Sequence, residues 1–279
     1  MAGKFGFIYG AFDILREADM TNLEKATQLN LEKGNQHLGI GVLDSELIED
    51  GAVKTTEDRM EIMLAFRGVD FVFRVTREQL EDREKMRVAA EQAYQEFLKT
   101  PKKPKDEGAK KYKAVYLPGT WDLFHLGHLR NIRKAIENGL MVFVGAKSDE
   151  LVYEHKNRRP ILQDEERMSL LRHLKGVTKV IKTHSRNPQI AIDLIGSLYE
   201  AEVEAICIGS DLKADFEAMR EKIDPKIDII YTDRDENEPS TTKDRKKLMQ
   251  ISGYTSLSGK MTRRTEAALV FMEGNIKER

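Results

Sequence analysis

The sequence predicts an α/β protein with a Rossmann-like, doubly wound parallel sheet, present as a partial degenerate N-terminal copy plus a complete C-terminal copy. Three observations predict this fold. Short apolar runs alternate with amphipathic stretches, which is typical of β-α units joined by crossovers. Several of the apolar runs end at a glycine, as strands do before a turn. The same pattern also occurs twice along the chain of 279 residues.

The repeat is visible in two stretches of similar sequence. "GAFDILREADMTNLEKA" starts at Gly10, and "GTWDLFHLGHLRNIRKA" starts at Gly119. In this alignment Asp13 meets Asp122, and farther along "TEDRM" (56–60) meets "DEERM" (164–168). Because the order of matches is kept, we interpret the pattern as an internal duplication.

Each element of the C-terminal copy has a reason in the sequence. The nearly continuous apolar run "LMVFVGA" is typical of a strand buried in a parallel sheet. Apolar residues at helical spacing, followed by Gly139 or Gly176, predict helices that stop at those glycines. The predicted order is strand 112–119, helix 126–139, strand 140–146, helix 164–176, strand 178–183, helix 188–201, strand 203–211 and strand 226–233.

Four segments are predicted along the chain. Residues 1–75 are predicted to form the lobe of the degenerate first copy, 76–110 a linker, 111–250 the domain of the complete second copy and 251–279 a helical extension. The linker combines a charged helix with a Pro/Lys-rich stretch, "TPKKPKDEGAKK", which is typical of a mobile spacer. The final stretch, "TRRTEAALVFMEGNIKER", has the apolar spacing of an amphipathic helix.

The composition is ordinary for a soluble globular protein, with 40% apolar and 33% charged residues and a formal net charge of -1. This charge gives no general reason for attraction to nucleic acid or membranes. The single cysteine, Cys207, excludes an internal disulfide and is interpreted as core packing. No apolar run approaches the roughly 18 residues of a membrane span, and no signal peptide is recognised. A cytoplasmic location is therefore expected.

Two histidines stand at a predicted helix start that follows a strand. His125 and His128 are three residues apart, so they share one face of the first helical turn. Free backbone N–H groups at such a start favour a polyphosphate, and Gly119 lets the backbone approach it closely. Gly127 keeps the face between the histidines open. Zinc is the rival ligand, but no cluster of converging Cys, His or acidic residues supports it.

These residues resemble the cytidylyltransferases that act on glycerol 3-phosphate, phosphocholine or phosphoethanolamine. "YLPGTWDLFHLGHLRNIRKA" is similar to the family's first strand, loop and helix. "EHKNRRPILQDEERMSLL" resembles its lysine-bearing loop and Arg-containing helix, and "CIGSDL" resembles its Gly-Asp-Asp strand end. "PSTTK" (239–243) resembles the Ile-Ser-Thr-Thr-Lys end of its second signature. The resemblance covers roughly Lys111 to Leu248.

The sequence departs from the family's pattern at two places. Lys175 stands where the family has the arginine of Arg-Tyr-Val-Asp, so a planar bidentate fork is replaced by a point charge. In "DRDENEPSTT", Arg234 is displaced relative to the family's Arg-Thr-Glu-Gly, whose glycine is missing.

The resemblance implies a nucleotidyltransferase that joins CTP to a phosphorylated alcohol and releases pyrophosphate. A phosphate monoester with a second pKa of about 6 is largely dianionic at pH 7, so the reaction needs positioning and charge neutralisation but no general base. Mg²⁺ is the implied cofactor, and its ligands are not identified. The implied catalytic residues are His125, His128, Lys156 and Thr241. The implied nucleotide-binding residues are Gly119, Thr120, Trp121, His125, Gly127, His128, Lys156, Lys175, Gly209, Asp211, Arg234, Ser240, Thr241 and Thr242. The implied acceptor-binding residues are Arg158, Arg159 and Arg167. Asp122 is interpreted as a helix cap in preference to a ligand.

Other functions are also compatible with the sequence. An ATP-dependent adenylyltransferase of the same superfamily is the main alternative, and a non-catalytic nucleotide-binding or regulatory protein is another. His-Leu-Gly-His and "SGKMTRR" (258–264) also resemble signatures of class I aminoacyl-tRNA synthetases. The lack of room for tRNA-binding domains and the net charge argue against that reading and against nucleic-acid partners. A homodimer or an intrachain pseudo-dimer is considered.

The first copy differs at the residues that would carry chemistry. Arg16 aligns with His125 and Asp19 with His128, and a carboxylate at that position repels a triphosphate. The first copy also ends near Val75, before any counterpart of "CIGSD" or "STTK". It is therefore predicted to be catalytically inactive.

Overall fold

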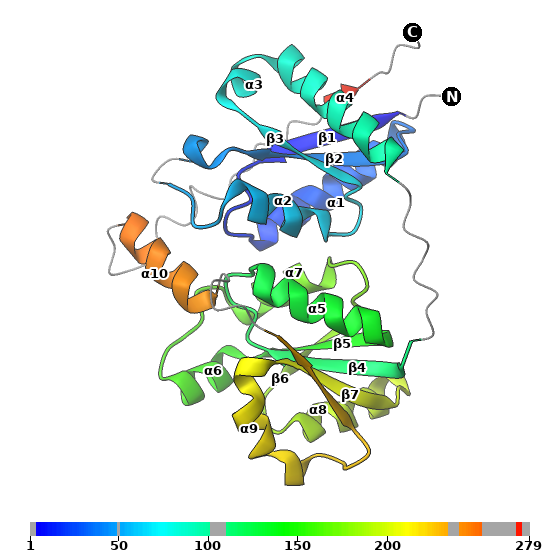
Figure 1. Cartoon of the computed structure of the whole chain (residues 1–279), viewed down its shortest axis with the longest axis vertical. Helices are drawn as coiled ribbons and strands as arrows, with labels where there is room; N and C mark the ends of the chain where they lie inside the picture. Colours follow the sequence, from blue (N-terminus) through cyan, green and yellow to red (C-terminus); the bar gives the residue numbers. More distant parts are fainter. Residues whose placement is uncertain (1–3, 49–50, 101–109, 234–239, 253–271, 275–279) are drawn as a thin grey trace. The chain divides into compact units, whose positions relative to one another are not determined.

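A computed structural model describes residues 4–48, 51–100, 110–233, 240–252 and 272–274 (Figure 1). The chain divides into two compact units. One comprises residues 1–102 together with 242–279, and the other comprises residues 103–241. Each unit is an α/β layer structure with its own sheet.

The unit formed by residues 103–241 contains a five-stranded, all-parallel sheet in the order β6-β5-β4-β7-β8. The chain starts in the centre with β4, runs to one edge, and then returns to the other side of β4 with β7. This arrangement is doubly wound, as the sequence predicts, and its switch point lies between β4 and β7. The strands are β4 (Tyr112–Gly119), β5 (Gly139–Lys147), β6 (Lys179–Thr183), β7 (Val203–Gly209) and β8 (Asp228–Thr232).

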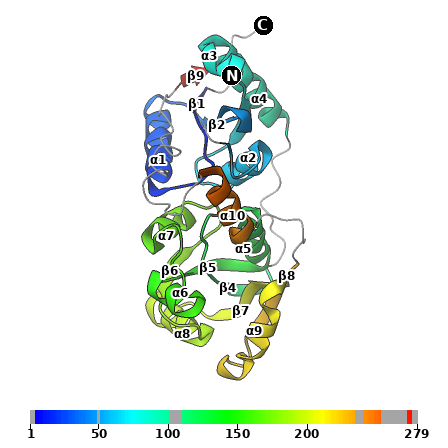
Figure 2. The same ribbon diagram turned by 90° about the vertical axis from the view of Figure 1, so that its left-hand side faces the viewer.

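Helices cover both faces of this sheet (Figure 1). Figure 2 shows α5 and α7 side by side on one face and α8 on the other. On the α8 face, apolar side chains of β4–β7 pack against Ala191, Ile192 and Ile195. The helices of this unit are α5 (Leu126–Asn138), α6 (Asp149–Lys156), α7 (Asp164–Arg172), α8 (Pro188–Tyr199) and α9 (Lys213–Glu217), with 3₁₀ turns η2 (Ser210–Leu212) and η3 (Arg220–Lys222).

The other unit contains a smaller sheet in the order β3-β2-β1-β9. Its first three strands are parallel, and β9 runs antiparallel to β1. The strands are β1 (Phe5–Gly10), β2 (His37–Leu43), β3 (Phe71–Val75) and β9 (Met272–Gly274). The helices are α1 (Glu17–Glu32), α2 (Thr56–Leu64), α3 (Arg77–Glu81) and α4 (Arg83–Lys99), with the 3₁₀ turn η1 (Ser45–Leu47). Helix α10 (Thr241–Ser252) enters this unit at Thr242.

The prediction that residues 76–110 form a linker is wrong for helix α4. It is a structural part of the N-terminal unit, because Met86, Ala90 and Tyr94 are buried against aromatic residues of β1 and β3. In Figure 1, α4 lies on the face of this sheet opposite α1 and α2. Only residues 101–109 of the predicted spacer lie outside the described residues.

The C-terminal part of the chain also differs from its predicted organisation. Helix α10 was assigned to the catalytic domain 111–250, yet from Thr242 onward the chain belongs to the unit that contains β1–β3. The predicted final helix includes 272–274, which form strand β9 instead. The backbone of Phe5–Phe7 supplies the hydrogen-bonding edge that β9 pairs with, and no local spacing reveals such a long-range partner.

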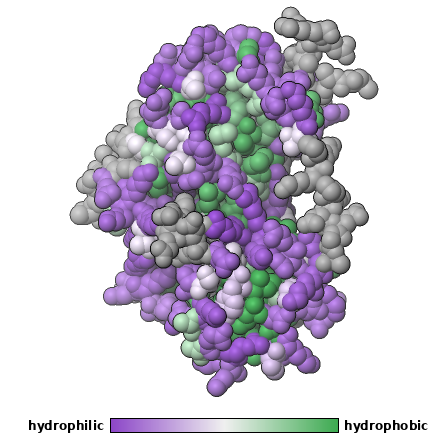
Figure 3. Space-filling view, in the orientation of Figure 1, coloured by the Kyte–Doolittle hydropathy of each residue, from purple (hydrophilic) through white to green (hydrophobic). Residues whose placement is uncertain are grey.

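Hydrophilic residues cover most of the face of each unit that Figure 3 shows, and hydrophobic residues occupy limited areas between them. This surface agrees with the high share of charged residues, 33%. None of the described helices is both long and apolar enough to cross a bilayer.

Candidate active site

The candidate site lies at the carboxyl edge of the five-stranded sheet, in the loop from β4 to α5. Parallel sheets bind ligands beyond the carboxyl ends of their strands, at the switch point of strand order. Strand β4 ends at Gly119 beside that switch point, and α5 begins at Leu126. The residues between them therefore occupy the position where this fold class binds ligands.

Asp122 fixes the shape of this loop. Its two carboxylate oxygens accept hydrogen bonds from the backbone N–H groups of Ile161 and Leu162, both at 3.0 Å. The side chain is buried, so these bonds replace its lost hydration. Asp122 therefore joins two loops of the unit, and the interpretation of Asp122 as a helix cap is wrong.

Trp121 is a packing residue at the base of the loop. Its backbone has φ of 62°, its indole is buried, and its N–H donates to the carbonyl of Gly145 at 2.9 Å. A Cβ on Gly119 would lie 2.4 Å from the indole ring. Residue 119 must therefore be a glycine because a side chain would collide with the tryptophan ring. The predicted reason, close approach of the backbone to phosphate, is a different one.

His125 and His128 stack on each other at the start of α5. Their ring centroids are 3.8 Å apart and the ring planes differ by 18°. His125 is the N-cap of α5, and its Nδ1 accepts from the backbone N–H of His128 at 3.4 Å. The ring of His128 also lies 5.3 Å from that of Trp121. The predicted shared face of the two histidines is therefore present in the structure.

Thr241 extends this arrangement. Its hydroxyl donates to the carbonyl of Asp122 at 3.0 Å and lies 3.4 Å from Nε2 of His125. Because the hydroxyl hydrogen is used by the carbonyl, the oxygen accepts from Nε2–H. Ser240 is buried next to Thr241 in the sequence, whereas Thr242 begins the part of the chain assigned to the other unit. Arg234 lies outside the described residues.

Three predicted cationic residues follow β5 at the same edge of the sheet. Lys156 ends α6, and Arg158 and Arg159 follow in the exposed connection to α7. Desolvation, followed by repulsion from Arg158, lowers the pKa of Lys156, and Asp122 opposes this shift. The guanidinium of Arg159 lies 5.7 Å from the ring centroid of Tyr153. The exposed side chains of Lys156 and Arg158 place positive charge at this edge of the sheet, which would attract an anionic ligand.

A family model described as cytidylyltransferase-like matches residues 116–261, which is over half of the chain. The chain belongs to the cytidylyltransferase-like family. The matched residues include the loop with Asp122, both histidines and Thr241, so the geometry described above is the family's part of this protein.

Three relatives represent the range of similar proteins. A phosphopantetheine adenylyltransferase of Pyrococcus furiosus is 46% identical over 59 residues, covering 21% of this chain and 37% of the relative. An FAD synthase of Pyrococcus abyssi is 30% identical over 119 residues, covering 42% and 77%. A probable ethanolamine-phosphate cytidylyltransferase of Encephalitozoon cuniculi is 35% identical over 72 residues, covering 26% and 22%. This chain spans between 37% and 49% of the length of the phosphopantetheine adenylyltransferases that it matches.

Arg167 has a different place in this cytidylyltransferase-like unit from the acceptor-binding one predicted. Its side chain is buried and donates to backbone carbonyls of Leu162, Thr120 and Lys147 and to the carboxylate of Asp149. Four of the five N–H donors of Arg167 are used by groups of this unit. We therefore remove Arg167 from the acceptor site and assign it to holding the ends of β4 and β5 together.

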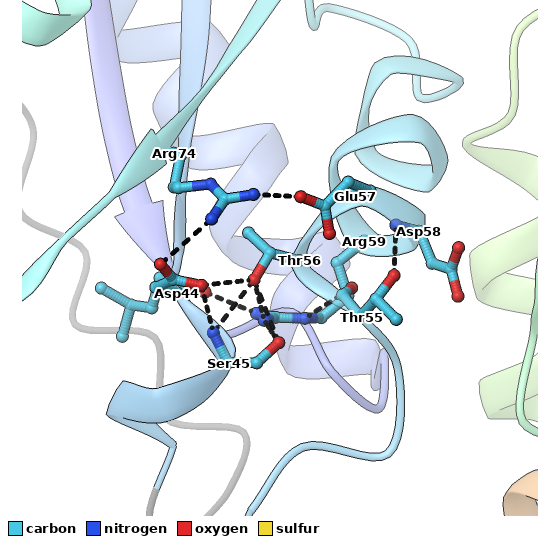
Figure 4. Close-up of polar contacts among 9 residues, drawn as sticks. Asp44, Ser45, Thr55, Thr56, Glu57, Asp58, Arg59 and Arg74 are labelled. Carbon is cyan, nitrogen blue, oxygen red and sulfur yellow. Dashed lines mark hydrogen bonds and ion pairs between the residues drawn. The ribbon is translucent and has the colours of Figure 1, made fainter.

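The N-terminal unit contains a matching arrangement at the aligned positions. Asp13 accepts from the backbone N–H groups of Val53 and Lys54, both at 2.9 Å. Arg59 is buried and donates to the carbonyls of Ala11, Leu43 and Thr55. Figure 4 shows its guanidinium among Ser45, Thr55 and Thr56. The N-terminal unit therefore keeps the bonds of the aspartate and the arginine although it lacks the two histidines. This indicates that Asp122 and Arg167 stabilise the fold.

Lys175 lies at the wrong edge of the sheet for the nucleotide site. It is in the turn after α7, before β6, and therefore at the amino edge. A Cβ on the adjacent Gly176 would lie 2.6 Å from Ile136, in the last turn of α5. Ile136 lies ten positions after Leu126 along the helix, which is about 15 Å at 1.5 Å per residue. The prediction that Lys175 binds nucleotide is therefore corrected.

The remaining predicted residues lie at the carboxyl edge. Thr120 and Gly127 are in the β4–α5 segment, and Gly209 and Asp211 are at the end of β7. A Cβ on Gly209 would lie 2.5 Å from the Asp211 carboxylate, so the glycine makes room for that side chain. These residues remain predicted ligand contacts.

Sequence reasoning missed three further basic residues, Lys147, His155 and Arg186. Lys147 is the last residue of β5, His155 lies in the last turn of α6, and Arg186 follows β6. Lys147 stands next to the apolar run "LMVFVGA", and its place at the end of a parallel strand is the signal that could have found it.

No group of three or more His, Cys, Asp or Glu side chains among the described residues is arranged to hold a metal ion.

Proposed function

We propose that the unit of residues 103–241 transfers a nucleotidyl group from a nucleoside triphosphate to a phosphorylated small alcohol. The observation that carries this proposal is the stacked pair His125 and His128 at the start of α5, beside the switch point of the sheet. Two imidazole rings on a helix start combine side-chain donors with free backbone N–H groups, which suits a polyphosphate.

The reaction requires orientation and charge neutralisation. An oxygen of the acceptor's phosphate attacks the α-phosphorus, a new P–O bond forms, and the bond to the β-phosphate oxygen breaks with release of pyrophosphate. Because the acceptor phosphate is already largely dianionic at pH 7, no residue must remove a proton. His128 would donate directly to the phosphates, and Nε2–H of His125 would be shared between the Thr241 hydroxyl and a phosphate oxygen. Mg²⁺ bound to the triphosphate would neutralise further charge.

We propose CTP as the nucleotide, supported by the similarity to ethanolamine-phosphate and choline-phosphate cytidylyltransferases. The second candidate is ATP, favoured by the similarity to phosphopantetheine adenylyltransferases. Pyrophosphate release measured with each of the four nucleoside triphosphates, against a panel of phosphorylated alcohols, separates the two. Turnover with ATP and none with CTP would establish the adenylyltransferase alternative.

The His128→Ala and His125→Ala variants test the proposed chemistry. We expect each to lower kcat by about 10² or more, the effect of removing one preorganised donor. His173→Ala is the matched control, because His173 follows α7 near the amino edge of the same sheet. Near-normal turnover in either site variant would contradict the assignment, and nucleotide binding without any turnover in the unmodified protein would support a regulatory role instead.

A further inference from the structure

Lys147 lies beside the histidine-bearing loop. In the register of β4 and β5, Gly119 pairs with Ala146, so Lys147 and Thr120 are the next residues beyond this pair. The buried guanidinium of Arg167 donates to the carbonyls of both Thr120 and Lys147. The backbone of Lys147 is therefore fixed next to the start of the loop that carries His125 and His128.

The N-terminal unit has the same frame without the lysine. There Arg59 donates to the carbonyl of Leu43, the last residue of β2, at 2.8 Å. Leu43 is thus the structural counterpart of Lys147. The fold of these two units does not require a positive charge at this position, because the unit without the histidines has a leucine there.

Other basic residues of the same unit lie near Lys147. It pairs in register with Thr183, the last residue of β6, and Arg186 follows three residues later. His155 and Lys156 lie in the last turn of α6, which follows β5. Lys147 is half-buried and forms no ion pair with a carboxylate in the part of the chain that the structure describes. The carboxylate of Asp215 is a negative charge near Lys147 and His155.

The electrostatics of the cluster favour an anion. Desolvation, then repulsion from Lys156 and Arg186, lowers the pKa of Lys147. Desolvation and repulsion from Arg186, Lys147 and Lys156 also lower the pKa of His155. Cations held close enough to repel one another, at the carboxyl edge of a parallel sheet, are typical of a site whose ligand supplies the missing negative charge.

We propose that Lys147 and Arg186 form a subsite for the phosphate of the phosphorylated acceptor, on the β5–β6 side of the histidine pair. This inference rests on the proposed function. The start of α5 and the switch point lie on the β4–β7 side and suit the triphosphate. A second phosphate on the β5–β6 side would approach the α-phosphorus from another direction than the departing pyrophosphate, as in-line attack requires.

Steady-state kinetics with the intact chain test the subsite. Lys147→Leu, which copies Leu43, and Arg186→Gln are expected to raise the KM of the phosphorylated acceptor by about tenfold or more, the effect of losing a charge-assisted hydrogen bond. The KM of the nucleotide should change less than about twofold. Lys147→Arg should recover part of the loss. Lys179→Leu, at the amino end of β6, is the control and should behave like the unmodified protein.

A binding measurement tests the subsite without turnover. Inorganic phosphate is titrated by calorimetry into the chain saturated with a non-hydrolysable nucleotide, and Lys147→Leu and Arg186→Gln should each weaken its binding by about tenfold. Unchanged phosphate binding in both variants, or an equal loss of nucleotide affinity, would overturn the proposal. Because Arg186 is exposed, its variant keeps the test valid if Lys147→Leu folds poorly. Absence of turnover in the unmodified protein would instead contradict the proposed function alone.

Discussion

At the scale of single residues, some of the charged and polar side chains stabilise the fold, whereas others belong to the candidate active site. Asp122 and Arg167 have the charges expected of ligands, yet both are buried and bonded to backbone groups. Their counterparts Asp13 and Arg59 make matching bonds in the unit where the histidines are replaced. A residue shared by both units therefore points to the fold, and a residue found only in the C-terminal unit points to the site.

The structural role of Arg167 predicts a loss of stability on substitution. Arg167→Met should lower the free energy of unfolding by about 3 kcal/mol or more, because several buried carbonyls and the Asp149 carboxylate lose their donor. Chemical denaturation of the intact protein measures this. Arg172→Met, on the exposed side of the same helix, should change stability by less than about 0.5 kcal/mol. Equal stability of the two variants would return Arg167 to the list of ligand candidates.

Asp19, which takes the place of His128 in the first copy, predicts a pH-dependent stability. Burial raises its pKa to about 7, against a smaller lowering by the backbone N–H and the charge of Arg16. The native state therefore binds a proton that the unfolded state releases near pH 3.8. The stability that Asp19 supplies is complete below that pH and is lost as the pH rises to about 7.

Replacing Asp19 by Asn removes this dependence while keeping an oxygen for the N–H of Arg16. We expect Asp19→Asn to stabilise the protein by on the order of 2–4 kcal/mol at pH 8 and to have little effect at pH 4. Thermal unfolding across this range, with Glu17→Gln as the exposed control, provides the measurement. A pH-independent gain would show that the carboxyl of Asp19 titrates normally.

At the scale of elements, α4 shows how a charged helix becomes part of a core. Tyr94 is fully buried, with its ring centroid 4.5 Å from that of Phe5 and 5.4 Å from that of Phe71. These rings come from α4, β1 and β3, so the helix closes a face of the sheet that would otherwise expose aromatic residues. The hydroxyl of Tyr94 has no hydrogen-bond partner among the described residues.

Two substitutions at Tyr94 separate packing from polarity. Tyr94→Ala should cost about 3–5 kcal/mol of unfolding free energy, since it empties the centre of the aromatic cluster. Tyr94→Phe should instead raise stability by about 1 kcal/mol, because it removes a buried hydroxyl that lacks a partner. Denaturant midpoints of both variants are compared with Glu96→Ala on the exposed side of α4. A destabilised Tyr94→Phe would mean that the hydroxyl is hydrogen-bonded in solution.

At the scale of the whole molecule, the two units predict one nucleotide per chain. Only the C-terminal unit has the histidine pair, and the corresponding positions of the N-terminal unit carry Arg16 and the buried Asp19. Calorimetry with the intact protein should therefore give a stoichiometry of one. Binding should vanish when both His125 and His128 are replaced by Ala. Two sites per chain, or tight binding that survives in the double variant, would show that the N-terminal unit also holds nucleotide.

The sequence by itself determined the doubly wound parallel fold and the place of the histidine pair. Both follow from local information: apolar runs of strand length, glycines at their ends, and two histidines one helical turn apart at the start of α5. The cytidylyltransferase-like residues were readable for the same reason, because they are close together in the chain.

Only the tertiary structure decided which charged residues belong to the site. The buried bonds of Arg167, the amino-edge position of Lys175 and the placement of Lys147 beside Thr120 all depend on contacts between distant segments. The same holds for β9, whose partner β1 lies at the opposite end of the chain. Charge and periodicity are properties of a short segment, whereas burial and strand neighbours are set by which segments meet when the chain folds.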